Sequence, residues 1–330
     1  MIEQERRLIM TKILVTGCLG QVGSDLVIKL REDYGIDNVI ATDLNENPDS
    51  KVCNEGIFEK LDVLDVDAYR ALVEKYNVDT IFNLAGVLSA VGEAKPTVCW
   101  NVNVGGVINT LEIAKDHNCK VLNISSIAAF GPSTPLDNTP QVTIQRPTTM
   151  YGVAKVASEL LCDYYHHKYG VDTRAVRFPG IISYAALPGG GTTDYAVEIY
   201  YEALKSGKYT SFIDKGTYMD MMYMPDAIGC LIQLMEADGD KLVNRNAYNV
   251  SAMSFEPEEI AASIKKYIPD FEMDYDVDPL RQGIAESWPN SLDISCAKEE
   301  WGFHTDYDLD AMSLDMLKNL SEKLNIPFEG

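Results

Sequence analysis

The stretch Ile13-Leu-Val-Thr-Gly17-Cys-Leu-Gly20-Gln-Val-Gly23 decides how the rest of the chain is interpreted. Its first four residues form an apolar run typical of a buried strand. The pattern from Gln21 to Tyr34 then predicts a helix that ends at Gly35. Glycines at a strand-to-helix turn let the backbone approach a phosphate closely, at the positive end of the helix. The spacing is G-x-x-G-x-x-G rather than the commoner G-x-G-x-x-G, so the turn predicts dinucleotide binding only together with its context.

Acidic and small residues at the ends of the following strands supply that context. Asp43 ends the second predicted strand, 20 residues beyond Gly23. A carboxylate there accepts hydrogen bonds from both ribose hydroxyls and repels a 2′-phosphate, which favours NAD over NADP. Asp62, followed by Val63, ends the third predicted strand, where it either lies near the adenine or is a solvated strand end. Leu84-Ala-Gly86 follows the fourth strand and leaves room for a cofactor.

Strand and helix patterns alternate from Lys12 to about Arg177. This alternation predicts βαβ units, and the nearly continuous apolar strands predict a parallel sheet covered on both faces. The fold class is therefore expected to be α/β with a doubly wound parallel sheet. The predicted strands are Ile13–Thr16, Val39–Thr42, Phe58–Asp62, Thr80–Leu84, Val121–Ser125 and Thr173–Arg177, with helices including Gln21–Tyr34 and Val104–Asp116.

The pattern is looser beyond Gly180. Helices are predicted near Asp194–Leu204, Pro225–Glu236, Pro257–Tyr267, Asp293–Trp301 and Leu309–Leu320, whereas residues 269–291 show little periodicity. We expect residues 1–10 to be an N-terminal extension and residues 11–180 to form a Rossmann domain that binds NAD. Residues 181–330 are expected to form mainly a smaller substrate-binding lobe that is interwoven with the first domain.

Composition excludes several classes of protein. The 330 residues are 46% hydrophobic and 24% charged, which is typical of a globular chain. The chain carries 28 Lys and Arg against 50 Asp and Glu, a net charge of -22. Such an acidic chain repels phosphate backbones and anionic lipids, so binding to nucleic acid or to membranes is not expected.

Cysteine and histidine usage argues against disulfides and metal. The seven cysteines are scattered and none stands in a C-x-x-C pair. The four histidines have no ligand-spaced partners, so no metal site is expected. The N-terminus lacks a secretory apolar core and no apolar run could span a bilayer. These features predict a cytoplasmic location, or a mitochondrial one if the source is eukaryotic.

Two serines, a tyrosine and a lysine form the candidate catalytic set. Ser125 and Ser126 end the fifth predicted strand, and Tyr151 and Lys155 stand one helical turn apart on the helix that follows. A tyrosine is a poor base at neutral pH because its reference pKa is about 10, but a nearby ammonium stabilises the phenolate. With a serine hydroxyl holding the substrate oxygen, this set suits removal of a hydroxyl proton as hydride leaves the same carbon.

Together these motifs resemble the extended short-chain dehydrogenase/reductase family, which includes the nucleotide-sugar epimerases. The resemblance runs from Lys12 to about Asn319. Within the family the chain is similar to the short-chain-type L-threonine 3-dehydrogenases. That similarity rests on the segments Ser125–Gly131, Thr149–Lys155, Arg177–Ser183, Leu187–Tyr195, Met221–Pro225 and Ser287–Pro289.

The resemblance implies a reaction and a set of site residues. The reaction is NAD-dependent, metal-free oxidation of L-threonine at C3 to 2-amino-3-oxobutanoate in threonine catabolism, by a homodimer. Tyr151 is the expected base and Lys155 its partner, with Ser126 preferred over Ser125 as the catalytic hydroxyl. Expected NAD-binding residues are Gly17, Leu19, Gly20, Gln21, Val22, Gly23, Asp43, Leu44, Asp62, Val63, Leu84, Ala85, Gly86, Asn103, Tyr151, Lys155 and Ile181. Expected substrate residues are Ser89, Ser126, Tyr151, Gly190, Thr192, Thr193, Asp194 and Trp288.

Several alternatives stay open at this point. Asp194 either orients the substrate ammonium or only caps the helix that begins there. Trp288 either forms a wall of the active site or fills the lobe. A nucleotide-sugar 4-epimerase or dehydratase would share the fold, but its diphosphate substrate calls for cationic groups, and Arg245 and Arg281 are the only arginines after Arg177. A regulator that senses NAD without performing chemistry would not require Tyr151 and Lys155.

Overall fold

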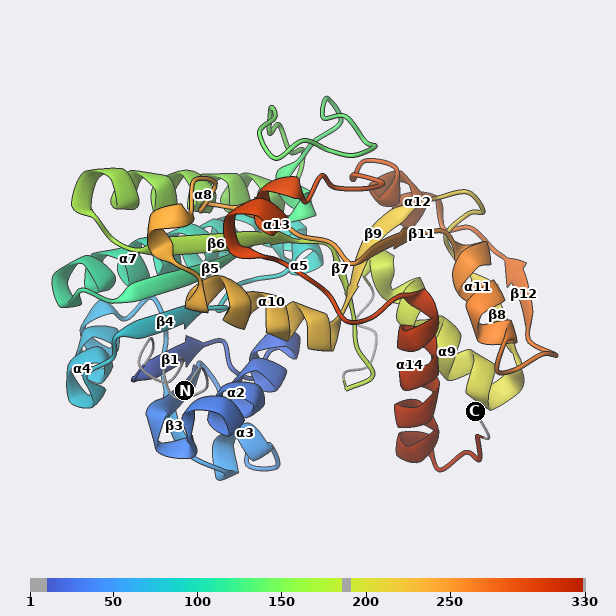
Figure 1. Ribbon diagram of the computed structural model, residues 1–330, viewed down its shortest axis with the longest axis horizontal. Coiled ribbons are helices and arrows are strands. Elements are labelled where there is room, and N and C mark those ends of the chain that lie inside the picture. The colour runs from blue at the N-terminus through green and yellow to red at the C-terminus, as the bar shows by residue number, and fades with distance from the viewer. Residues whose placement is uncertain (1–10, 186–190, 329–330) are drawn as a thin grey trace.

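The computed structural model describes residues 11–185 and 191–328, and a seven-stranded parallel sheet is its central feature (Figure 1). The strand order is β10-β6-β5-β4-β1-β2-β3. From β1 the chain first adds β2 and β3 towards one edge of the sheet. It then adds β4, β5, β6 and β10 towards the other edge, which is the doubly wound arrangement. The strands are β1 Ile13–Thr16, β2 Val39–Asp43, β3 Ile57–Lys60, β4 Thr80–Asn83, β5 Lys120–Ser126, β6 Thr173–Phe178 and β10 Tyr248–Asn249.

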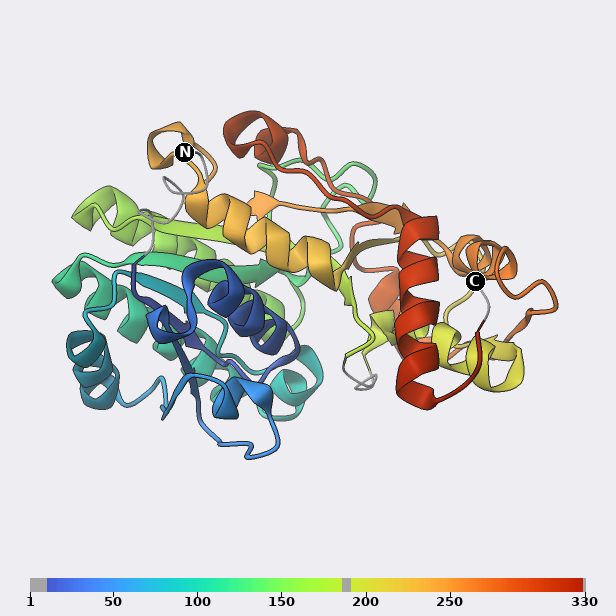
Figure 2. The ribbon, with the colours of Figure 1, turned by 60° about the horizontal axis from the view of Figure 1, so that its bottom comes forward.

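Helices cover both faces of this sheet (Figures 1 and 2). On one face α2 and α10 pack in a core with Val15, Val39 and Leu122. On the other face α4, α7 and α8 pack against Leu14, Ile40 and related residues. The helices of this half are α2 Gln21–Tyr34, α3 Lys51–Asn54, α4 Val66–Tyr76, α5 Ser89–Ala94, α6 Pro96–Trp100, α7 Gly106–His117 and α8 Met150–Tyr169, with a π-helical turn at Asn101–Gly105.

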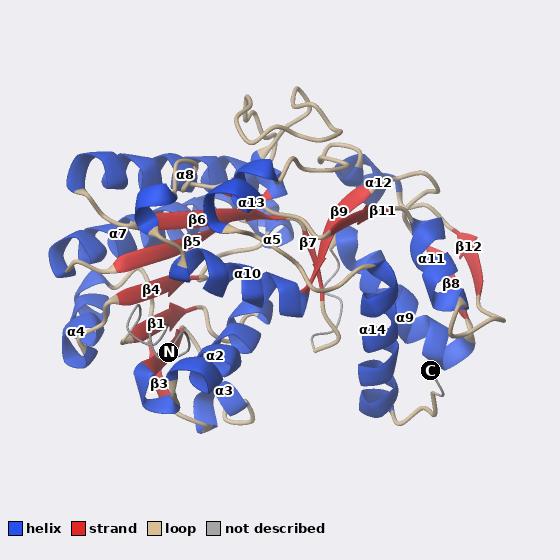
Figure 3. Ribbon diagram, in the orientation of Figure 1, coloured by secondary structure: helices blue, strands red, loops and turns tan. Residues whose placement is uncertain are grey.

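The second half of the chain builds a lobe beside the sheet and also returns to the sheet itself (Figure 3). The lobe has its own core around Tyr195, Met219 and Met316. Its strands are β7 Gly180–Ile182, β8 Lys208–Ser211, β9 Met219–Tyr223, β11 Met253–Phe255 and β12 Glu272–Tyr275. Its helices are α9 Tyr195–Ser206, α11 Pro257–Lys265, α12 Pro279–Ala285 and α14 Leu309–Leu324, while α10 Met224–Glu236 and α13 Ser295–Trp301 pack on the main domain.

The predicted α/β fold class is confirmed, and the strands of the first half agree to within two residues. The third strand is the main difference. It ends at Lys60 rather than Asp62, because Asp62 turns out of the sheet and its Oδ1 accepts the Leu64 N–H at 2.9 Å. In the second half, the short strands and α12 were not predicted from the sequence. Residues 1–10, expected to be an extension, lie outside the described residues.

All seven cysteines lie within the described residues as free thiols. Within residues 11–185 and 191–328, no group of three or more His, Cys, Asp or Glu side chains could hold a metal ion. Over the same ranges, no helix has both the length and the apolar character needed to cross a membrane.

Candidate active site

The glycine turn leaves no room for side chains. Gly17 has a φ of +69° and passes so close to the strand beside it that a Cβ would lie 2.7 Å from the backbone nitrogen of Ala85. At Gly23, a Cβ would lie 2.3 Å from the carbonyl oxygen of Gly17. Glycine is therefore required at both positions, and the N-terminus of α2 opens directly onto the space above β1.

Asp43 lies at the end of β2, where the sequence predicted an acid. Its Oδ2 accepts the backbone N–H of Leu19 at 3.0 Å, and its Oδ1 accepts that of Asn45 at 3.3 Å. The carboxylate is half-buried beside the glycine turn. This arrangement holds one charged group next to the turn and fits a sugar hydroxyl better than a phosphate.

A cleft of about 340 Å³ runs from the glycine turn to α8. Of the expected cofactor residues, it is lined by Gly17, Gly20, Gln21, Val22, Gly23, Leu84, Ala85, Gly86, Asn103, Tyr151, Lys155 and Ile181. Leu19, Asp43, Leu44, Asp62 and Val63 are not among its lining residues. The glycine turn, the helix N-terminus and the neighbouring carboxylate together fit a dinucleotide with free ribose hydroxyls, as NAD has.

The sequence reading missed several residues of this cleft. Asn83, Val87, Asn123, Ile124, Ser158 and Phe178 also line it. Asn83 and Asn123 lie opposite each other on neighbouring strands, and the Nδ2 of Asn83 donates to the Oδ1 of Asn123 at 3.0 Å. Their polar character inside apolar strands was the signal that could have revealed them, because a buried strand seldom carries an amide without a role.

Asn103 shapes the far wall of the cleft. It lies in the π-helical turn before α7 and makes two hydrogen bonds with Val87: its Oδ1 accepts the backbone N–H at 2.7 Å and its Nδ2 donates to the carbonyl at 2.9 Å. A π-helical turn of this kind is common at functional sites because it widens the helix locally. Here the π-helical turn places the Asn103 side chain where its amide holds the backbone of Val87 in the loop after β4.

Helix α8 carries the predicted tyrosine and lysine. Thr149 caps the helix by accepting the N–H of Gly152 at 3.1 Å. Lys155 donates from Nζ to the carbonyl oxygen of Ile124 at 2.6 Å, and this Nζ lies 5.3 Å from the ring centroid of Tyr151. The ammonium is thus held by β5 at a distance where it attracts negative charge on the phenol.

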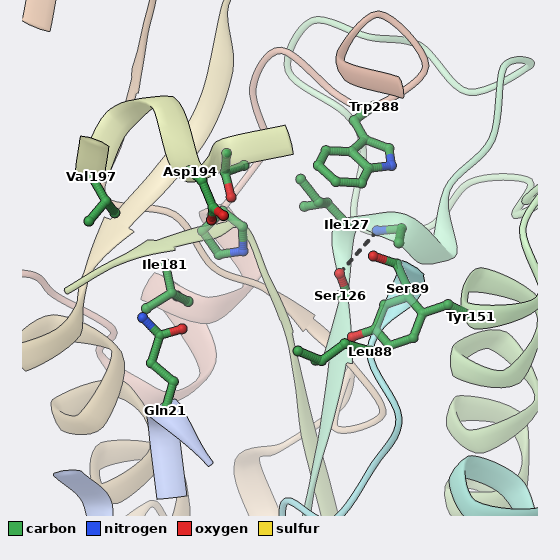
Figure 4. Close-up of a pocket in the computed structure, with 14 residues that line it drawn as sticks. Gln21, Leu88, Ser89, Ser126, Ile127, Tyr151, Ile181, Asp194, Val197 and Trp288 are labelled. Carbon is green, nitrogen blue, oxygen red and sulfur yellow. Dashed lines mark hydrogen bonds between the residues drawn. The ribbon is translucent and has the colours of Figure 1, made fainter. Parts of the chain in front are cut away.

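The two neighbouring serines at the end of β5 have different surroundings. Ser125 is buried, and its hydroxyl donates to the carboxylate of Glu159. Ser126 is half-buried, and its Oγ accepts the N–H of Ala128 at 3.2 Å, which leaves its proton free to donate. Figure 4 shows the Ser126 hydroxyl and the Tyr151 phenol close together at one side of a second cavity.

This second cavity, of about 240 Å³, adjoins the cofactor-shaped cleft. The two share Gln21, Leu88, Ser126, Tyr151, Pro179 and Ile181 as lining residues. Among the expected substrate residues, Ser89, Ser126, Tyr151, Thr193, Asp194 and Trp288 line it. Thr192 is buried and does not line it, and Gly190 lies outside the described residues.

Asp194 occupies a turn before helix α9. Its Oδ2 accepts the backbone N–H of Gly191 at 2.7 Å, and its side chain makes no capping hydrogen bond to α9. The carboxylate therefore closes the turn Gly191–Asp194 while it borders the second cavity. Trp288 lies across that cavity and packs beside Ile127 and Phe130 (Figure 4).

The sequence matches a known family over most of its length. A profile of the NAD dependent epimerase/dehydratase family matches residues 13–251. The chain belongs to this family. A relative named only as an uncharacterized epimerase/dehydratase, from Staphylococcus saprophyticus, is 58% identical over 314 residues, which cover 95% of this chain and 98% of that protein.

Among similar solved structures, several are named as L-threonine dehydrogenases. The L-threonine dehydrogenase of Clostridium difficile is 62% identical, with a TM-score of 0.94 over 95% of this chain and 98% of that one. The L-threonine 3-dehydrogenase of Trypanosoma brucei is 41% identical, with a TM-score of 0.92 over 97% and 100% of the two chains. The predicted resemblance to the extended short-chain dehydrogenase/reductases is confirmed, and the family and these neighbours support an NAD-dependent oxidoreductase.

Proposed function

We propose that the chain oxidises the C3 hydroxyl of L-threonine to give 2-amino-3-oxobutanoate. The observation that carries this proposal is the meeting of two cavities at Tyr151 and Ser126. One cavity adjoins the glycine turn and the other is small. A substrate in the second would therefore present its hydroxyl to Tyr151 at the mouth of the first. The names of the similar solved structures support the choice of threonine.

The chain's own residues divide the work of the reaction. NAD, when bound in the cleft, supplies the acceptor for the hydride that leaves C3. Ser126 donates a hydrogen bond to the substrate oxygen, and the Tyr151 phenolate takes its proton as the carbonyl forms. The Lys155 ammonium, held on Ile124, stabilises the negative charge on that phenol oxygen before the transfer.

The second cavity suits a small zwitterion. Ser89 and Thr193 offer hydroxyls, and the Asp194 carboxylate offers a counter-charge for the ammonium. Trp288 closes the side opposite Gln21 and limits the size of the ligand. We propose that these four groups select threonine.

A nucleotide-sugar substrate is the second candidate because the curated relatives are named epimerase/dehydratases. The described lining of the second cavity contains no arginine and no lysine, which a diphosphate would call for. This observation favours threonine. A regulator that senses NAD without chemistry remains the third candidate.

Assembly and location are proposed on separate grounds. Helices α5 to α8 expose apolar side chains on one side of the domain, among them Val91, Val98, Trp100, Ile108, Val153 and Leu160. An exposed apolar surface of this kind is typical of a subunit interface. We propose a homodimer packed through α8. A division into residues 11–180 and 181–330, and a cytoplasmic location, also stay predictions.

The proposal is tested by mixing purified protein with NAD and L-threonine and following NADH absorbance. NADP, L-serine and D-threonine serve as controls. NADH formation with L-threonine and NAD is the expected result. No NADH with threonine, while NAD still raises the melting temperature, would contradict the proposed substrate and turn attention to nucleotide sugars. No reaction with these either would favour the regulator.

A further inference from the structure

Glu159 is a buried carboxylate that no step of the proposed reaction uses. It lies on α8, two turns beyond Tyr151, and its side chain is 3% exposed. It lines neither of the two cavities of the candidate active site. Among the described residues of the candidate active site, its side chain accepts a hydrogen bond from the Ser125 hydroxyl. Burying a charge costs free energy, so the hydrogen bond between this carboxylate and strand β5 needs an explanation.

The carboxylate is fully satisfied by donors from several elements. Its Oε1 accepts from Ser125 and from the Nε of Arg177 at 3.1 Å. Its Oε2 accepts from the Nη2 of Arg177 at 2.9 Å and the Nε2 of Gln145 at 2.8 Å. Arg177 is held in turn by the carbonyl oxygen of Gln141 at 2.9 Å and the Oδ1 of Asn249 at 3.0 Å. Loss of Glu159 or of Arg177 would leave the other as a buried charge without its ion-pair partner, so the network is costly to break.

The network sets the register between β5 and α8. Ile124 is tied to Lys155 through its carbonyl oxygen, and Ser125 is tied to Glu159 one turn further along the helix. These two consecutive strand residues are therefore fixed to consecutive turns of one helical face. The next strand residue, Ser126, lines both cavities together with Tyr151, which stands one turn before Lys155.

We propose that Glu159 is a positioning residue: through Ser125 it fixes the end of β5 on α8 and so holds the Ser126 hydroxyl against the Tyr151 phenol. The proposal rests on the proposed function, since it assigns Ser126 and Tyr151 to one substrate oxygen. It also explains why two serines follow each other. The Ser125 hydroxyl donates its hydrogen bond to Glu159, so of these two serines Ser126 is the one free to donate to a substrate.

A third cavity makes the proposal testable by chemical rescue. This cavity, of about 270 Å³, is lined by Glu159 and Arg177 and is bordered by the exposed side chains of Val142 and Val243. It is therefore open to small solutes. In Glu159→Ala, formate can enter by this route and place a carboxylate beside Ser125 and Arg177.

The main experiment measures kcat and KM for Glu159→Ala with and without formate. We expect kcat to fall between about tenfold and a hundredfold, because a small misplacement of reacting groups has an effect of this size. The KM for NAD and the KM for L-threonine should change little. Formate should restore part of kcat. Ser125→Ala should lower kcat to a similar degree, but without rescue by formate, because the strand side of the connection is then missing.

Arg174→Met is the matched control. The buried Arg174 forms an ion pair with the half-buried Asp172, and its Nη1 donates to the carbonyl oxygens of Leu234, Met235 and Ala237 at 2.7 to 3.0 Å. Its loss should lower the melting temperature while leaving kcat unchanged well below that temperature. A merely stabilising role for Glu159 would give this same result, and that outcome would overturn the proposal.

Hydrogen exchange separates this proposal from the proposed reaction. If the wild type does not oxidise threonine, the reaction is wrong, but the connection between β5 and α8 can still be measured. The amides of Ile127, Ala128 and Ala129, which follow Ser126, should exchange faster in Glu159→Ala and slow again with formate. Unchanged exchange, or wild-type kcat in Ser125→Ala, would overturn the positioning role.

Discussion

The buried carboxylate of Asp220 predicts an unusual dependence of stability on pH. Asp220 lies in β9 and is 1% exposed. Its Oδ1 accepts the Ser251 hydroxyl at 2.6 Å, but within the described residues its Oδ2 makes no well-formed hydrogen bond. Burial raises the pKa of Asp220 to about 7, and the contacts with Ser251 and the Leu292 backbone oppose this only partly. The folded protein therefore holds a proton that the unfolded chain releases at much lower pH.

The size of the effect follows from this difference in pKa. An unfolded aspartate has a pKa of about 3.9, so a folded value about three units higher corresponds to about 4 kcal/mol. The free energy of unfolding is not reduced below about pH 3, where both states hold the proton. It declines as the pH rises towards 7, and the full penalty of about 4 kcal/mol is present above pH 8. Asp220→Asn carries no charge at any pH and escapes this penalty.

The assay is urea unfolding of wild type and Asp220→Asn at several values between pH 5 and pH 8. The advantage of the variant should grow by about 2.5 kcal/mol across this range. Asp226→Asn is the control, because its carboxylate accepts the N–H groups of Asp306 at 2.8 Å and Tyr307 at 3.2 Å. In Asp226→Asn the side-chain NH2 group would face one of these backbone N–H donors, so the variant should be less stable than wild type at every pH. A difference between Asp220→Asn and wild type that stays constant from pH 5 to pH 8 would refute the reasoning.

Four further predictions concern the candidate active site. Tyr151→Phe should lower kcat at least about a hundredfold while NAD still raises the melting temperature, since the ring remains and only the proton acceptor is lost. Gly23→Ala should lower the melting temperature and abolish the shift caused by NAD, because its Cβ would lie 2.3 Å from the Gly17 carbonyl oxygen. Asp43→Asn should raise the ratio of kcat/KM for NADP to that for NAD by about tenfold, as a charge repulsion is removed. Asp194→Asn should raise KM for threonine, and unchanged kinetics would leave this side chain only its role in the turn.

The sequence was informative where function depends on consecutive residues. The turn Gly17–Gly23 needs a strand, three glycines and a helix in immediate succession, and all three are visible in the order of residues. The pair Tyr151 and Lys155 is visible for the same reason, because a helix brings residues four apart onto one face. The carboxyl ends of the parallel strands lie at one edge of the sheet and bring these groups together. The strands and the cofactor cleft of the first half were therefore largely predictable from the sequence.

The lobe was read poorly because its strands are short and lie in two small sheets. Strand β11 has three residues, and β12 pairs with β8 across more than sixty positions of sequence. A run of three or four residues gives too few alternations for a periodic signal. Strand β9 is hard to recognise for a different reason: all five of its residues are buried, Asp220 included, so it has no solvent-exposed face that would give an alternating pattern.

The second cavity depends on contacts that no local pattern encodes. Gln21 comes from the glycine turn, Ser89 from the start of α5, Thr193 from the turn before α9 and Trp288 from the segment after α12. Only the fold brings these together. Thr192 illustrates the point: it stands next to Thr193 in sequence, yet it turns into the interior, because neighbouring residues of a short helical turn point in different directions. Resemblance to a family can propose both residues, but burial separates them.

Ile181 shows how the two halves become one site. It lies in β7, which follows β6 after a single intervening residue, Pro179, and pairs with β9 of the lobe. It is therefore rigidly connected to both the main sheet and the lobe, and it lines both cavities. A strand in this position transmits any change in lobe packing directly to the junction where Tyr151 and Ser126 meet. Substitutions in β9 next to Ile181, such as at Met222, should therefore change the substrate specificity although they contact neither the cofactor nor the substrate.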